Sequence, residues 1–168
     1  MFAKEDSIKA VIRARRINFL IAGIAVFTGG MIYVLCRPSD YSFFQWIRSM
    51  GFDGALSFLR IHSLPNGSQL PEWIVFSLPD GLWAFAYTLL ILTIWFNSKS
   101  SWKYLWYATI PALTIGSEIL PWQGIIPGTF CLSDLVIIVC GLIAGILTAN
   151  INLKQSRHEK AQVFRNAG

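Results

Sequence analysis

Three carboxylates lie at the ends of long apolar segments of the chain. Glu118 lies one turn before Pro121, near the end of an apolar segment. Asp80 opens the preceding apolar segment, and Asp134 opens the last one. A charge within a membrane span costs roughly 2.5–3.5 kcal/mol on insertion scales, so such a residue is by default a functional candidate. We therefore take Glu118, Asp80 and Asp134 as candidate catalytic residues, suited to acid–base chemistry.

Each carboxylate also has a structural alternative. Asp80 follows Ser77 at the spacing of a capping box, and the positive end of a helix dipole favours Asp80 and Asp134 alike. Glu118 lies near the carboxyl end of its helix, where the dipole disfavours a negative charge. A hydrogen bond from a neighbouring polar group, such as Tyr87, could still accommodate Glu118. The functional interpretation is therefore strongest for Glu118.

Further polar groups accompany the carboxylates and form a set of candidate binding residues. The Pro-Gly turn at 127–128 suits a type II turn with positive φ at Gly128. Its backbone amides could bind an anion, or it could be a plain re-entrant turn. The candidate binding residues are Gln123, Tyr87, Thr129 and Gly128. The three carboxylates could hold a divalent cation through oxygen ligands, and the sequence indicates no other metal or cofactor.

Composition places the chain among membrane proteins. Of its 168 residues 54% are hydrophobic and 14% are charged, whereas soluble domains carry roughly 25% charged residues. The net charge of +5 is concentrated at the ends of apolar runs. That placement indicates membrane topology, and we expect membrane lipids rather than nucleic acid as partners.

The apolar runs predict one all-α, polytopic membrane domain over residues 1–168. A run of about 20 apolar residues is long enough to span a bilayer. One or two short interfacial helices are expected in an outer segment, 38–77, and Pro111 predicts a kink in the third span. Residues 1–16 are either a surface helix or an extension of the first span. The predicted segments are the transmembrane helices 17–36, 78–96, 102–120 and 134–150, the outer turn 121–133 and the tail 151–168.

The distribution of positive charge predicts the orientation of these spans. Eleven of the 14 Lys and Arg residues fall within 1–16, 97–103 and 152–168. By the positive-inside rule both termini are cytoplasmic, and the carboxylates face the outer side. Gly141 and Gly145 have the small-xxx-small spacing that permits close helix contact, so they mark a candidate face for a helix partner.

The polar pattern from Pro79 to about Gly145 resembles the VanZ-like family of small integral membrane proteins. The residues that carry the resemblance are Asp80, Tyr87, Glu118, Gln123 and Asp134. The His of the family pattern would fall near Ala84 and its Arg at Thr129, so neither is retained here. The resemblance implies a bacterial cytoplasmic membrane protein with an outer carboxylate patch. It implies no settled reaction.

Two functions follow as hypotheses. In the first, the carboxylate patch binds or acts on a cell-envelope or lipid-linked molecule, and whether it is an enzyme stays open. In the second, the chain is a non-enzymatic membrane scaffold or partner subunit whose carboxylates are helix caps. The two differ in whether Glu118, Asp80 and Asp134 share a pocket.

Overall fold

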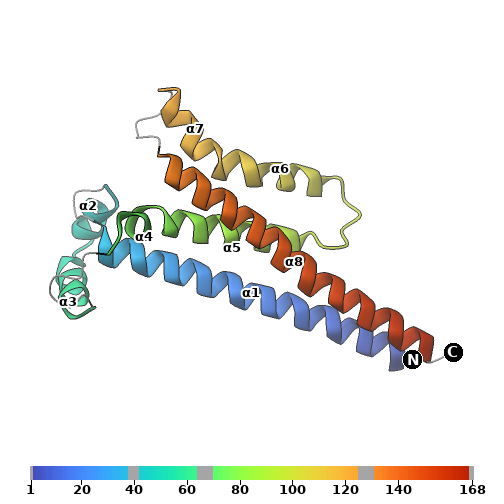
Figure 1. Cartoon of the computed structure of the whole chain (residues 1–168). Helices are drawn as coiled ribbons and strands as arrows, with labels where there is room; N and C mark the ends of the chain where they lie inside the picture. Colours follow the sequence, from blue (N-terminus) through green and yellow to red (C-terminus); the bar gives the residue numbers. More distant parts are fainter. Residues whose placement is uncertain (1, 38–41, 64–69, 125–130, 167–168) are drawn as a thin grey trace.

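The computed structural model describes residues 2–37, 42–63, 70–124 and 131–166 of the chain. All regular structure in this part is α-helical, which confirms the predicted fold class. The helices are α1 (Phe2–Cys36), α2 (Ser42–Ser49), α3 (Asp53–Ser63), α4 (Glu72–Phe76), α5 (Leu78–Ile94), α6 (Trp102–Thr114), α7 (Gly116–Trp122) and α8 (Leu132–Asn166). Figure 1 shows them as an elongated bundle with both chain ends at one end.

Three long helices, α1, α5 and α8, form the body of the bundle. Glycines bring α5 and α8 close together. A Cβ on Gly141 would meet the carbonyl oxygen of Gly81, and a Cβ on Gly145 would lie 2.8 Å from the carbonyl oxygen of Phe85. The predicted close-contact face of Gly141 and Gly145 therefore packs on α5 of the same chain. These contacts also show that α5 and α8 run parallel.

The first and last helices are longer than the spans predicted from the sequence. Helix α1 is continuous from Phe2 to Cys36, so residues 2–16 extend the first predicted span rather than forming a separate surface helix. Helix α8 likewise continues through the predicted tail to Asn166. Basic side chains did not end either helix, because Lys and Arg are good helix formers.

The described part of the segment between α1 and α5 contains α2, α3 and α4, where the sequence predicted one or two short interfacial helices. Helix α3 is fastened to the end of α1 by Arg60, whose Nε donates to the carbonyl of Val34 at 2.9 Å and whose Nη2 donates to that of Arg37 at 2.7 Å. The Val34 carbonyl belongs to the last turn of α1 and the Arg37 carbonyl follows directly after that helix, where intrahelical partners run out. The Tyr33 ring stacks on that of Phe44 at 5.9 Å, which fixes α2 in the same place. Their location at a membrane interface stays a prediction.

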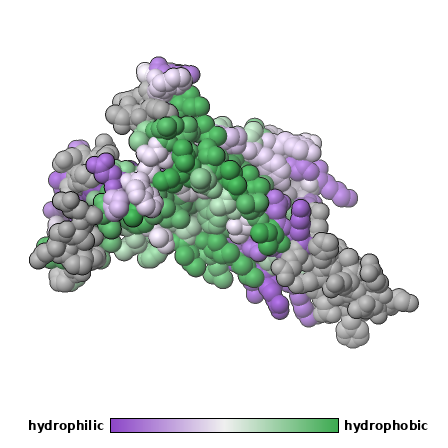
Figure 2. Space-filling model, viewed as in Figure 1, coloured by the Kyte–Doolittle hydropathy of each residue, from purple (hydrophilic) through white to green (hydrophobic). Residues whose placement is uncertain are grey.

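Three helical segments are long and apolar enough to cross a membrane: Lys9–Cys36, Glu72–Ile94 and Leu132–Lys154. The second of these joins α4 to α5 through Ser77. Figure 2 shows an apolar band across the middle of the molecule, with hydrophilic surface toward its ends. The chain is therefore a membrane protein by the length and composition of its helices.

The third predicted span, 102–120, is divided in two. Helix α6 ends at Thr114, α7 begins at Gly116, and Pro111 lies within α6. Proline cannot donate to the helical ladder, but the bond it removes lies one turn before Pro111, whereas the division lies after it, at Ile115. Helix α6 runs antiparallel to α5, because the hydroxyl groups of Tyr87 and Thr109 lie 2.6 Å apart and the rings of Trp95 and Trp106 are stacked at 6.4 Å.

Candidate functional site

A pocket lies between four helices at the end of the bundle opposite the termini, which we call the pocket end. Its volume is about 370 Å³. Helices α5, α6, α7 and α8 contribute its lining, which consists of Asp80, Trp83, Ala84, Tyr87, Leu113, Thr114, Ser117, Glu118 and Ile138. Apolar and polar groups share the cavity, an arrangement common among binding sites for small molecules.

The three predicted carboxylates lie at this end, and we call them the carboxylate cluster. Asp80 and Glu118 line the pocket directly, from α5 and α7. Asp134 does not line it, but lies close enough to act electrostatically on both of the others. The parallel packing of α5 and α8 brings the first turns of both helices to the same end of the bundle, where Asp134 lies opposite Ser77.

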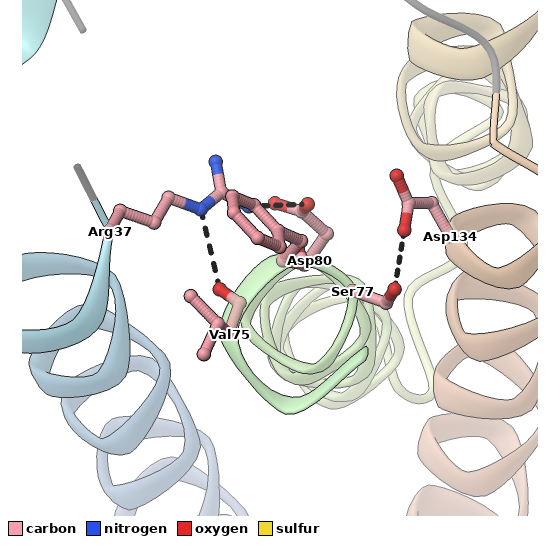
Figure 3. A network of polar contacts seen from close by, with 6 residues as sticks. Arg37, Val75, Ser77, Asp80 and Asp134 are labelled. Carbon is pink, nitrogen blue, oxygen red and sulfur yellow. Dashed lines mark hydrogen bonds and ion pairs between the residues drawn. The ribbon is translucent and has the colours of Figure 1, made fainter. Parts of the chain in front are cut away.

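Asp80 forms an ion pair with Arg37, which lies just beyond the end of α1. The Nη2 atom of Arg37 is 3.1 Å from Oδ2 of Asp80. The guanidinium also donates to the carbonyl oxygens of Val75 and Phe76, at 3.4 and 2.6 Å, and lies over the ring of Tyr33. Figure 3 shows Arg37 reaching across from α1 to the start of α5. Arg37 therefore neutralises one of the two carboxylates that line the pocket.

Asp134 is held by a serine rather than by its own helix terminus. The Ser77 hydroxyl donates to Oδ1 of Asp134, across the gap between α5 and α8. Ser77 makes no side-chain hydrogen bond to the first turn of α5. The capping box considered for Ser77 and Asp80 is therefore not formed, because the Ser77 hydroxyl is used between helices.

Glu118 has a different kind of partner. The backbone amide of Cys131, just before α8 begins, lies near its carboxylate and stabilises the negative charge. Neither Glu118 nor Asp134 forms an ion pair within the described part of the chain. The negative charge of Glu118 at the pocket is thus balanced by no cationic side chain among the described residues.

The predicted binding residues are divided by the structure. Tyr87 lines the pocket, whereas Gln123 is exposed and lies outside its lining. Gly128 and Thr129 fall outside the described residues. Among the residues that are described, no three His, Cys, Asp or Glu side chains are grouped as ligands of a metal ion would be. A divalent cation at the three carboxylates stays a prediction.

Sequence reasoning missed several lining residues, of which Trp83, Thr114 and Ser117 matter most. The tight polar turn at 97–101 could have predicted them, because it indicates that the helices on either side pack as an antiparallel pair. In an antiparallel helix pair centred there, residues whose numbers sum to roughly the same value lie opposite one another. Asp80 and Ser117 satisfy this relation, as do Tyr87 and Thr109.

A second group of polar residues, which the sequence did not predict, lies between α1, α5 and α8, toward the other end of the bundle. Asn18 of α1 donates through Nδ2 to the Thr93 hydroxyl at 2.9 Å and accepts from Nδ2 of Asn152 at 2.6 Å. Asn18 and Thr93 are completely buried. We call these three residues the amide cluster. It ties α1, α5 and α8 together within the apolar part of the bundle.

Comparison with family models, with curated protein sequences and with solved structures finds no match to this chain.

Proposed function

We propose that α6 and α7 together make a fourth membrane crossing. Helices α5 and α8 run parallel, so the chain must return along the bundle between the end of one and the start of the other. The pairing of α6 with α5 follows that return path, since Tyr87 meets Thr109 and both Asp80 and Glu118 reach the pocket. The 13 residues of α6 and seven of α7 provide roughly 30 Å of helix, enough for one crossing.

Four crossings put both termini on one side of the membrane and the pocket near the other. The positive-inside rule makes the terminal side cytoplasmic, because most Lys and Arg residues lie there. The pocket then faces the outer leaflet and the cell envelope. This orientation agrees with the resemblance to VanZ-like proteins of the bacterial cytoplasmic membrane.

The protein, in this proposal, binds an amphiphilic molecule of the cell envelope in the pocket. The observation that supports it is that Asp80, Tyr87 and Glu118 face one cavity whose other walls include Trp83, Leu113 and Ile138. Polar groups at a membrane-facing cavity with apolar walls suit a lipid or lipid-linked molecule, since its head and its chain need different surroundings.

The alternative of a non-enzymatic scaffold receives less support. Its working surfaces were expected to be the face of Gly141 and Gly145 and the aromatic outer segment, and the first of these is covered by α5 of the same chain. Its carboxylates were expected to be helix caps, and Ser77 does not form the capping box with Asp80. A scaffold could still use the exposed apolar surfaces of the bundle, but nothing distinguishes those from surfaces that face lipid.

A survival assay tests the proposal. Cells that lack the native copy receive the wild type or Glu118→Gln, at matched membrane levels, and are challenged with envelope-targeting agents that include teicoplanin. The matched control is Glu72→Gln, the same substitution at an exposed residue of α4 outside the pocket. We expect protection with the wild type and the control and its loss with Glu118→Gln. Equal protection by all three proteins would favour the scaffold.

A further inference from the structure

The hydroxyl groups in the described lining of the pocket direct their protons away from the cavity. The Thr114 hydroxyl donates to the carbonyl of Ile110 at 2.6 Å, one turn back in α6. The Ser117 hydroxyl donates to the carbonyl of Thr114 at 2.8 Å. A hydroxyl group has one proton and two lone pairs. Both groups can therefore offer a ligand only an acceptor.

The Tyr87 hydroxyl also offers a ligand only an acceptor, because its proton is used in a hydrogen bond to Thr109. The Thr109 hydroxyl donates to the carbonyl of Trp106 at 2.6 Å, so its proton is not available to Tyr87. The hydroxyl groups of Tyr87 and Thr109 are 2.6 Å apart, and the donor of that bond must then be Tyr87. Only the lone pairs of the Tyr87 oxygen remain for a ligand.

Trp83 carries a further N–H group near the cavity. A Cβ built on Gly29 would lie 2.8 Å from Nε1 of Trp83, so the N–H edge of the indole faces α1. Helix α1 contributes no residue to the lining of the pocket. The indole N–H is therefore directed toward α1 rather than into the cavity.

The charge of the lining also favours a ligand group that donates hydrogen bonds and is positively charged. Asp80 is paired with Arg37, and Glu118 has the Cys131 amide but no ion pair within the described part of the chain. Asp134 adds a nearby negative charge that lies outside the lining. The described lining therefore combines hydrogen-bond acceptors with an excess of negative charge, which repels a phosphate and attracts a cationic donor.

Resting on the proposed function, we infer that the group bound in this pocket is a protonated primary amine carried by an amphiphilic molecule. An ammonium group has three donors and no acceptor, which complements a lining of acceptors. Its bonds to carboxylates are charge-assisted and therefore stronger than those of a neutral hydroxyl group. The apolar side of the pocket, with Leu113 and Ile138, accommodates the adjoining chain.

Lipid retention separates this inference from simple attraction of a cation. The full chain is placed in phosphatidylglycerol nanodiscs containing equal amounts of phosphatidylethanolamine and phosphatidylcholine, and native mass spectrometry identifies the lipids that stay bound. Both zwitterionic lipids carry a phosphate and a positive nitrogen, but only phosphatidylethanolamine has N–H donors. We expect it to be retained roughly tenfold more than phosphatidylcholine, the ratio for one charge-assisted hydrogen bond. Equal retention would overturn the inference.

Two variants locate the effect, and free ethanolamine identifies its source. Glu118→Gln should abolish the preference for phosphatidylethanolamine and Glu72→Gln should preserve it; a preference that survives Glu118→Gln would overturn the assignment to this pocket. If free ethanolamine displaces the lipid, the amine alone is sufficient for binding. If it does not, the acyl chains also contribute to binding. If the wild type shows no preference for phosphatidylethanolamine while Glu118→Gln still loses protection in cells, the inference of an amine ligand is wrong but the proposed function stands. If that variant protects normally, the proposed function fails.

Discussion

The amide cluster and the carboxylate cluster lie toward opposite ends of the bundle, and they satisfy their polar groups in different ways. In the amide cluster, Asn18, Thr93 and Asn152 bond to one another and are neutral. The members of the carboxylate cluster are partnered by groups outside it, and two of them face a cavity. A polar group within a bundle thus has a structural role when neighbouring side chains occupy all of its hydrogen-bonding positions. It is a candidate for binding when some of those positions face open space.

Both clusters depend on the register of α5 and α8, so the largest effect is expected from Gly141→Ala. The new methyl group would meet the carbonyl oxygen of Gly81, which is backbone and cannot move aside. We expect the free energy of unfolding to fall by about 3 kcal/mol, the upper part of the range for overpacking. Titration with SDS, followed by tryptophan fluorescence, measures it.

The control for this substitution is Gly23→Ala in α1, where a Cβ meets nothing within 4 Å. It gives the same gain in helix propensity without placing the new methyl group against a neighbouring helix. If the two variants are equally stable, the glycine contact does not set the register. The two clusters would then be positioned independently.

The amide cluster gives the next largest effect, through Asn18→Leu. The leucine leaves the Thr93 hydroxyl and the Asn152 amide without their buried partner. A loss of about 1–2 kcal/mol in unfolding free energy is expected, since each buried polar group left unpaired is costly. Asn150→Leu, at an exposed position of α8, makes the same exchange without breaking an observed bond. Retention of phosphatidylethanolamine should change little in either variant.

A stable Asn18→Leu protein that loses the lipid would reverse the comparison. It would mean that the amide cluster contributes to binding rather than to packing. Thermal unfolding and lipid retention, measured on the same preparation, distinguish the two outcomes.

The sequence predicted the helical class and the end of the bundle where Asp80 and Glu118 lie, because apolar length and charge placement are local properties. It did not predict that Arg37 would meet Asp80, since that contact depends on how α1, α4 and α5 converge. The amide cluster was missed for a similar reason. Asn18 and Asn152 are tolerable singly near span ends, and only the packing shows that they bond to each other.

The break between α6 and α7 was predictable in kind but not in place. Pro111 predicts a kink, yet the amide of Ile115 still bonds to the carbonyl of Pro111, so the helix continues for another turn before it breaks. The position of the break matters, because it places Ser117 and Glu118 in the pocket. Propensity alone does not specify it; the packing of α6 against α5 also contributes.

A smaller effect is expected from the pair of Arg37 and Asp80, which a double-mutant cycle isolates. The variants are Arg37→Gln, Asp80→Asn and the two combined. We expect a coupling free energy of about 1 kcal/mol, modest because Asp80 keeps 30% of its side-chain surface exposed. The same cycle with Glu118→Gln in place of Asp80→Asn should give no coupling. Equal coupling in both cycles would mean that Arg37 serves the whole pocket rather than Asp80 alone.

The smallest effect on stability is expected from Glu118→Gln, and it sharpens the comparison most. Glutamine has the same shape and keeps a carbonyl oxygen near the Cys131 amide, and removal of the charge relieves repulsion from Asp134 and Asp80. The unfolding free energy should therefore stay within about 0.5 kcal/mol of the wild type, as for a substitution without a structural role. The same thermal and SDS unfolding measurements check it. A loss as large as that of Asn18→Leu would place Glu118 with the structural polar groups. Stability that is retained, together with lost protection in cells, would show that the chain keeps this charge at the pocket for a ligand rather than for its fold.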